Sequence, residues 1–139
     1  MIARCFADTN IFLYAASKAP EDRGKRKVAR TLLESEDVGI SAQVLQEFFA
    51  AATGKKRLGI SEAEALQAIA AMMEFPVLPV TGELVQEAIG LKVRHGISYW
   101  DAAIVAAACE LGCEVLYTED LNDGQDYGGV IARNPFARS

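Results

Sequence analysis

The stretch RCFADTN at residues 4–10 decides how this chain folds. Its first five residues contain the apolar run Cys5–Ala7 and end in a carboxylate, which predicts a short buried strand with Asp8 at its carboxyl end. Thr9 and Asn10 then begin a run of apolar residues, IFLYA at residues 11–15, which is typical of a buried helix. The chain therefore opens with a strand that leads directly into a helix.

The same alternation continues along the rest of the chain. We predict further strands over residues 37–41, 76–80, 113–118 and 130–132, and a turn-rich loop over residues 119–129. Helices are predicted after Pro20 to Glu36, around residues 44–52, and over residues 61–73, 81–95 and 98–111. Strands that alternate with helices form a mainly parallel sheet with helices on both faces. We expect an α/β fold of three layers, α/β/α, with about five strands.

Length and composition indicate one ordinary globular unit. The 139 residues match the usual size of a single domain, so residues 1–139 are expected to form one. The longest apolar stretch, residues 102–109, is far shorter than the ~20 residues that cross a bilayer, and the N-terminus meets Asp8 where a signal peptide would continue. Three cysteines without a CxxC pair favour reduced thiols. We expect a cytoplasmic protein without a membrane partner.

The charge distribution bears on nucleic acids in two opposite ways. The net charge of −5 argues against a protein that binds nucleic acid by bulk electrostatics. The basic residues are nevertheless clustered, once at residues 55–57 and once on the predicted helix after Pro20. The helix cluster can contact phosphates, although a solvated helix face is the plain alternative; its members are Arg23, Lys25, Arg26, Lys27 and Arg30.

Three acidic residues are expected at one edge of the sheet. Asp8 and Asp120 each lie at or just beyond the carboxyl end of a predicted strand, and Asp101 opens the helix that precedes the fourth strand. Ligands of open α/β sheets bind beyond the carboxyl ends of the strands, where the strand order reverses. These acids are therefore candidates for a shared site.

Each acid also has a simpler interpretation. Asp8 is a preferred residue for capping the next helix. Asp101 can form a capping box with Ser98. However, residues 99–111 contain only two charged side chains, Asp101 and Glu110, which predicts a buried helix. A carboxylate in such a place needs a hydrogen-bond partner or a metal.

The remaining candidates rest on weaker signals. Glu47 lies about 130° around its helix from the centre of the apolar stripe, which predicts a solvent-facing side chain. The loop after the fourth strand offers both Asp120 and Asp123, with Asp120 nearer the strand end, and Thr118 could orient Asp120 through its hydroxyl. A polar turn is the alternative for this loop.

The donor atoms point to a hard cation. Carboxylate oxygens suit Mg²⁺ or Mn²⁺, whereas zinc and copper sites usually include His or Cys ligands, and this chain has one His. Such a site can activate water for attack on a phosphate and stabilise the leaving oxygen.

With these residues in view, the chain resembles PIN-domain proteins, specifically the VapC-type toxins of VapBC toxin–antitoxin modules. The resemblance covers nearly the whole chain and rests on the order and spacing of several short motifs. They are FADTNIFLY at residues 6–14, QEF at 46–48, SYWDAAI at 98–104, LYTEDL at 116–121 and NPF at 134–136.

The resemblance implies a PIN-like fold and a Mg²⁺- or Mn²⁺-dependent endoribonuclease that serves as the toxin of a type II toxin–antitoxin system. It implies an RNA substrate, a cognate antitoxin that covers or enters the acidic cleft, and a homodimer. The residues implied as catalytic and metal-binding are Asp8, Glu47, Asp101 and Asp120. Those implied as supporting polar groups are Thr9, Asn10, Thr118 and Asp123.

Three other classes share parts of this pattern. A phosphatase of the haloacid-dehalogenase type usually has a second Asp where this chain has Asn10, and no suitable downstream Lys is evident. A receiver domain carries its phosphoacceptor in mid-chain, whereas Asp8 follows the first strand. A degenerate PIN-fold protein that only binds a partner is disfavoured by the four acids. Cleavage of RNA, compared with phosphate release from small phosphomonoesters, separates these classes.

Overall fold

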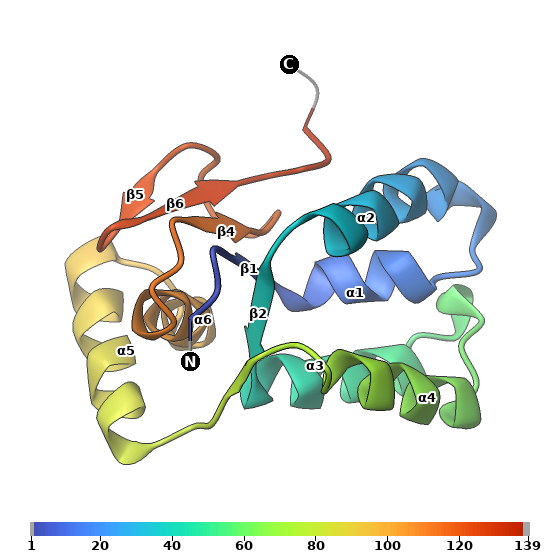
Figure 1. Cartoon of the computed structure of the whole chain (residues 1–139), viewed down its shortest axis with the longest axis horizontal. Coiled ribbons are helices and arrows are strands. Elements are labelled where there is room, and N and C mark those ends of the chain that lie inside the picture. The colour runs from blue at the N-terminus through green and yellow to red at the C-terminus, as the bar shows by residue number, and fades with distance from the viewer. Residues whose placement is uncertain (1, 138–139) are drawn as a thin grey trace.

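A six-stranded sheet lies between two groups of helices in the computed structural model, which describes residues 2–137 (Figure 1). The strands are β1 (Cys5–Ala7), β2 (Val38–Ser41), β3 (Val77–Leu78), β4 (Val115–Tyr117), β5 (Asp126–Tyr127) and β6 (Val130–Arg133). They are arranged in the order β3-β2-β1-β4-β6-β5, and every pair is parallel except β5 with β6. The predicted α/β class with a mainly parallel sheet is confirmed.

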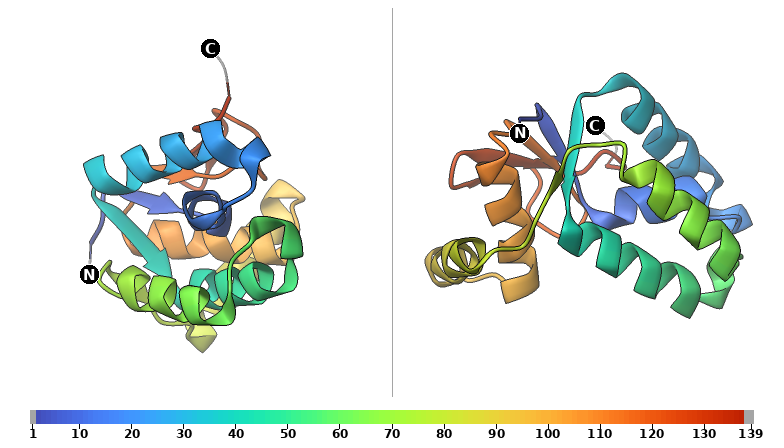
Figure 2. Two further views of the ribbon diagram at one scale, coloured as in Figure 1. Left: turned by 90° about the vertical axis from the view of Figure 1, so that its right-hand side faces the viewer. Right: turned by 60° about the horizontal axis from the view of Figure 1, so that its bottom comes forward.

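The helices cover both faces of this sheet. They are α1 (Thr9–Ala16), α2 (Arg23–Ser35), α3 (Ala42–Gly54), α4 (Glu62–Met72), α5 (Gly82–His95) and α6 (Tyr99–Glu110), with short 3-10 turns at Pro20–Asp22 and Lys56–Leu58. Helices α5 and α6 lie on one side, and α1 to α4 lie on the other (Figures 1 and 2). No helix in the described part of the chain is long and apolar enough to cross a membrane.

Local capping signals set several helix ends where the sequence predicts them. Ser61 Oγ accepts a hydrogen bond from the Glu64 amide at 3.1 Å, and Glu64 Oε1 accepts one from the Ser61 amide at 3.0 Å, which completes a capping box. The hydroxyls of Thr81 and Ser98 accept hydrogen bonds from the amides of Leu84 and Asp101, without the reciprocal bond of a capping box. Each cap satisfies a backbone donor that the helix cannot pair internally, so these starts are encoded locally.

The strand β5 is a departure from the predicted loop over residues 119–129. It pairs antiparallel with β6, and the two are joined by Gly128 and Gly129, which have φ angles of 68° and 103°. A two-residue hairpin turn of this kind requires positive φ, which glycine adopts without steric cost. The sheet therefore has one strand more than the five expected.

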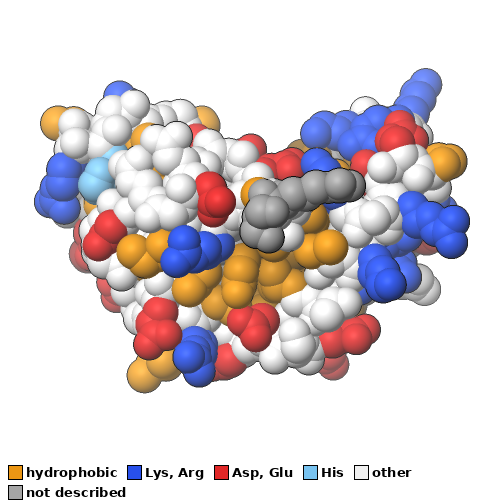
Figure 3. Space-filling model, turned by 90° about the horizontal axis from the view of Figure 1, so that it is seen from above, with side chains coloured by type: hydrophobic (Ala, Val, Ile, Leu, Met, Phe, Trp, Pro, Cys, Tyr) orange, Lys and Arg blue, Asp and Glu red, His pale blue; other side chains and the backbone are white. Residues whose placement is uncertain are grey.

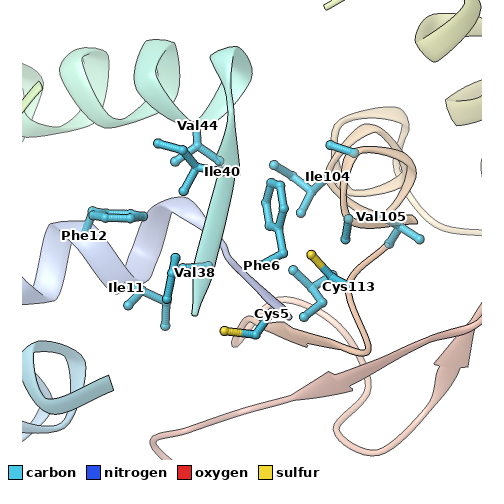
Figure 4. Packing of buried hydrophobic residues seen from close by; sticks show 14 of the residues in the cluster. Cys5, Phe6, Ile11, Phe12, Val38, Ile40, Val44, Ile104, Val105 and Cys113 are labelled. Atoms are coloured by element: carbon cyan, nitrogen blue, oxygen red, sulfur yellow. The ribbon is translucent and has the colours of Figure 1, made fainter. Parts of the chain in front are cut away.

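The core lies between the sheet and both helical layers. Phe6 of β1 is fully buried and packs near Ile104 of α6 and Ile40 of β2 (Figure 4). Helix α6 is buried at seven consecutive residues, Ala102–Ala108, as its apolar sequence predicts. Cys5 and Cys113 are free and buried, and burial raises the pKa of each thiol to about 12, so both stay protonated.

The strand order reverses between β1 and β4. Strands β2 and β3 extend the sheet to one side of β1, whereas β4 and β6 extend it to the other. Ala7 of β1 pairs with Tyr117 of β4, so both strands end at the same level. The residues that follow them, Asp8 and Thr118, consequently lie side by side at the reversal point, where α/β sheets bind ligands.

Candidate active site

A hydrogen-bonded clasp joins the ends of β1 and β4. The Asp8 amide donates to the carbonyl of Tyr117 at 3.0 Å. Thr118 Oγ1 donates to Asp8 Oδ2 at 2.8 Å, and the Thr9 amide donates to Asp8 Oδ1 at 2.7 Å. Asp8 and Thr118 are only 5% and 1% exposed. Asp8 thus caps α1, and the same hydrogen bonds hold its carboxylate at the end of β1. Its role as a helix cap is therefore compatible with a role in the candidate site.

The same threonine orients the second acid of the cluster. Thr118 Oγ1 accepts a hydrogen bond from the Asp120 amide at 3.1 Å, and Asn10 Nδ2 donates to Asp120 Oδ2 at 3.2 Å. The oxygen Asp123 Oδ1 instead accepts from the amide of Asn134 at 2.9 Å and ties its loop to the chain after β6. Of the two loop acids, Asp120 is therefore the one oriented by residues around Asp8.

The prediction that Glu47 faces solvent is wrong. Its side chain is half-buried, and Glu47 Oε1 accepts a hydrogen bond from Thr9 Oγ1 at 2.9 Å. The prediction assumed that α3 has a single buried face. Because α3 packs against both α1 and α4, a second face of the helix is also covered. Glu47 consequently joins the acids at the end of β1.

Gln43 also belongs to the candidate site, although no motif in the sequence pointed to it. It is 7% exposed, and its Nε2 donates to Glu47 Oε2 at 3.1 Å and to the carbonyl of Trp100 at 3.1 Å. It thereby connects α3 to the first turn of α6. The available signal was its position four residues before Glu47, a spacing at which helical side chains meet.

Asp101 lies in the first turn of α6, where Ser98 caps the helix. The Asp101 amide donates to Ser98 Oγ at 3.1 Å, so the cap uses the backbone of Asp101. The Asp101 side chain is half-buried, and its charge contributes to raising the pKa of Asp120. The carboxylate thus acts electrostatically on the cluster while its backbone is fixed by the cap.

The four carboxylates repel one another. The pKa of Asp8 is raised from 3.8 to about 7. Burial is the main cause, the hydrogen bonds from Thr118 and Thr9 oppose it, and the charges of Asp120 and Glu47 add to it. Burial likewise raises the pKa of Asp120, and the charges of neighbouring acids, Asp101 among them, add to this effect. A bound cation would relieve this repulsion.

The chemical type of the candidate ligands suits a hard cation. All four candidate donors are carboxylates, which Mg²⁺ and Mn²⁺ prefer, and Mg²⁺ usually binds only a few protein oxygens together with water. Within residues 2–137, no three acidic, His or Cys side chains already form a metal-binding group. The structure thus supplies suitable donors that interact electrostatically with one another, without a completed coordination sphere.

Helix α2 uses several of its basic residues to hold the structure together. Lys25 Nζ forms an ion pair with Glu119 at 3.2 Å, donates to the Tyr14 hydroxyl at 3.1 Å, and lies 5.4 Å from the Phe136 ring centre. Arg26 donates to the carbonyl of Ser17. These contacts link α2 to α1, to the loop of Asp120 and to the chain after β6.

Other basic residues on α2 remain directed outward. Arg30 donates to the carbonyl of Ala15, whereas Arg23 and Lys27 are exposed and form no ion pair or side-chain hydrogen bond with any described residue. Together with Arg26 they line a shallow surface hollow. Figure 3 shows Lys and Arg side chains gathered at the end of the molecule that carries α1 and α2, at the right of the view. Arg23 and Lys27 are therefore the members of the predicted basic cluster with unengaged charges.

Comparison with known proteins identifies relatives of this arrangement. The PIN domain family matches residues 5–123. A toxin–antitoxin complex from Klebsiella pneumoniae is similar with a TM-score of 0.69 and 20% identity, covering 95% of this chain and 98% of that chain. Mycobacterium tuberculosis VapC20, a toxin that cleaves the sarcin–ricin loop, is similar with a TM-score of 0.67 and 24% identity, covering 84% and 89%.

A third similar structure is VapBC2 from Rickettsia felis, bound to a DNA fragment from its promoter. It has a TM-score of 0.65 and 18% identity, covering 96% of this chain and 98% of that chain. No curated protein matches the sequence. At these identities the similarity concerns the fold, and it extends over nearly the full length of both chains.

Proposed function

Because the chain belongs to the PIN-domain family, we propose that it is a metal-dependent endoribonuclease and the toxin of a type II toxin–antitoxin pair. The observation that carries this proposal is the convergence of four carboxylates at the point where the strand order reverses. Similar folds in toxin–antitoxin complexes support a cognate antitoxin as a partner. We extend the proposal to an RNA substrate, a homodimer and a cytoplasmic location.

Mg²⁺ or Mn²⁺ would be held by Asp8, Asp101 and Asp120, with Glu47 as a further ligand. A divalent cation supplies activation of water and stabilisation of the leaving oxygen in phosphodiester hydrolysis. Supporting polar groups keep these carboxylates in place: Thr118 fixes Asp8, and Thr9 fixes Glu47. Asn10 orients Asp120, and Asp123 anchors the loop that carries it.

Cleavage of a mixed RNA pool tests the proposal. The purified chain is incubated with RNA in Mg²⁺, in Mn²⁺ and in EDTA, and in parallel with a small phosphomonoester. We expect RNA fragments only in the presence of a divalent cation and no release of phosphate from the monoester. Phosphate release would indicate a phosphatase, and intact RNA under all conditions would favour a PIN protein that only binds a partner.

We expect Arg23 and Lys27 to contact RNA phosphates without reading sequence. In an inactive Asp101→Asn background, replacing both with Gln should weaken binding about equally for different RNA sequences. It should also reduce the slope of log affinity against log salt concentration by up to about 1.4, since each phosphate contact to a single strand accounts for about 0.7. Fluorescence anisotropy at several salt concentrations measures this slope.

A matched control removes two cations from another helix. Lys92 and Arg94 are exposed in the last turn of α5, and their replacement with Gln alters the net charge equally. The salt slope should then change less than in the α2 variant. Equal changes would mean that α2 contributes only to the overall charge of the protein.

A further inference from the structure

A small pocket lies next to the carboxylate cluster, between the start of α3 and the starts of α5 and α6. We call it the Ser41 pocket; it has a volume of about 70 Å³, and its lining includes Ser41, Gln43, Gln46, Tyr99 and Trp100. Gln43 also donates a hydrogen bond to Glu47, so the pocket and the carboxylate cluster share a side chain. A molecule bound in the pocket would therefore lie beside the candidate active site.

One residue that lines this pocket, Ser41, carries an unsatisfied polar group. Ser41 is 1% exposed, and its Oγ forms no hydrogen bond with any described residue. Ser41 immediately precedes α3, where a serine usually caps the helix, but its side chain makes no capping bond. Buried hydroxyl groups in proteins nearly always have a partner. The Ser41 hydroxyl thus keeps an unused hydrogen-bonding capacity next to the pocket.

An exposed aromatic ring lies at the rim. Trp100 is 64% exposed, and Tyr99 packs edge-on against it at 5.0 Å between ring centres. The ring immediately precedes Asp101 in sequence, and the carbonyl of Trp100 is held by Gln43. Unpaired bases of single-stranded RNA stack on such rings, and their edges accept and donate hydrogen bonds.

We propose that the Ser41 pocket binds one unpaired nucleobase of the RNA substrate, next to the phosphate that is cleaved. Trp100 stacks on the base, while Ser41 and the amide of Gln46 bond to its edge. At about 70 Å³ the pocket admits the polar edge of a base but not the whole ring, so the ring plane stays on Trp100. This inference rests on the proposed ribonuclease function and assigns it a specificity site.

Trp100 is the only tryptophan of the chain, so its fluorescence reports directly on the pocket. The Asp8→Asn protein, which should not cleave RNA, is titrated with a short oligoribonucleotide and with an abasic oligomer of the same length. We expect the oligoribonucleotide to quench the fluorescence and the abasic oligomer to leave it unchanged. Equal responses, or no response at saturating RNA, would overturn the proposal.

Substitutions separate stacking from a merely structural role. In the same background, Trp100→Leu should weaken binding of labelled RNA about tenfold, whereas Trp100→Phe should keep most of the affinity. Val93 of α5 is 77% exposed and lies outside the pocket lining, so Val93→Ala should bind RNA normally. Unchanged binding by Trp100→Leu would refute the stacking role.

Ser41→Ala provides a second and independent readout. Removal of an unpaired buried hydroxyl should leave the melting temperature unchanged or raise it, because no bond within the protein is lost. The same substitution in the active protein should reduce the preference among bases at the cleavage site. If the preference is unchanged, Ser41 does not contact the base.

Two further results keep this proposal separate from the proposed function. RNA cleavage by the wild type without quenching in Asp8→Asn would overturn the pocket assignment and leave the ribonuclease standing. Quenching without cleavage would overturn the ribonuclease and the placement of the base next to a cleaved phosphate, and would leave only a pocket that binds an RNA base. Sedimentation of wild type and Trp100→Leu checks the competing use of this face. If the wild type forms a dimer, Trp100→Leu does not, and the dimer shows no quenching, then Trp100 lies in a contact between two copies of the chain. That result would overturn the proposal.

Discussion

Expression of the chain without a partner is expected to arrest growth, and the substitution Asp101→Asn is expected to remove the arrest. Asn keeps the shape of the side chain but lacks the charge that a divalent cation requires. Changes to groups that merely support a metal ligand already cost about 10- to 100-fold, so loss of a ligand charge should reduce RNA cleavage at least about 100-fold. Growth curves and cleavage rates measure both effects.

A matched control lies at the other end of the same helix. Glu110 is an exposed residue of α6, and Glu110→Gln removes one negative charge without altering the cluster. This variant should arrest growth like the wild type. The backbone of Asp101 remains capped by Ser98, so Asp101→Asn should be soluble at the same level. Growth arrest by soluble Asp101→Asn would exclude Asp101 from the active site.

The metal-free protein is expected to become more stable as the pH falls from 8 to 5. The pKa of Asp8 is about 7 in the folded state, against an ordinary value of 3.8. Between these values the folded state binds a proton that the unfolded state has released, so the free energy of unfolding falls as pH rises and levels off above the folded pKa. Two pH units correspond to roughly 3 kcal/mol, or a melting temperature about 10 °C higher at pH 5.

The pKa of Asp120 is also raised, so it adds to the same trend, whereas Glu64 titrates outside this pH window. The pKa of Glu64 is lowered to about 2 by its hydrogen bond with Lys18, so the interaction that it supplies is lost only at a much lower pH.

A metal ion that binds only the folded protein should stabilise it at pH 8 by about 2.7 kcal/mol at a hundredfold excess over Kd. Scanning calorimetry with and without Mn²⁺ measures both effects.

Asp8→Asn should weaken the dependence of the melting temperature on pH and on Mn²⁺. Without a buried charge at this position, the metal-free variant should melt above the wild type at pH 8, and Mn²⁺ should raise its melting temperature less. Glu110→Gln, which changes an exposed carboxylate, should retain the wild-type dependence on pH and metal. A wild type whose melting temperature responds to neither pH nor Mn²⁺ would show that these acids form no common metal site.

The elements that the sequence predicted best are those specified by neighbouring residues. The capping box of Ser61 and Glu64 and the N-cap of Thr81 depend on side chains within three positions of the backbone that they satisfy. Strand β1 was evident because its three residues are apolar and Asp8 follows them. The structure buries all three residues. Strand β5 could not be recognised in this way, since two residues are too few for a pattern and its pairing depends on β6.

The polar contacts of the site were harder to predict because they join distant segments. An apolar stripe locates one buried face of α3, but the place of Glu47 depends on Thr9, which lies 38 positions earlier. Likewise, Lys25 was predicted to belong to a basic cluster that contacts phosphates, but in the fold it pairs with Glu119, which is 94 positions away. Such pairings follow from the strand order and not from local spacing.

The clasp between β1 and β4 also sets when the site can exist during synthesis. Asn10 and Asp120 lie 110 positions apart in sequence and are hydrogen-bonded in the folded chain. At translation rates of about 5 to 20 residues per second, the ribosome needs roughly 5 to 20 s to proceed from one to the other. Throughout this interval Asp8 lacks the threonine that orients it, and the cluster lacks Asp120. The nascent chain thus cannot assemble the cluster until residue 120 has been made, and a product that ends before residue 118 lacks both Thr118 and Asp120.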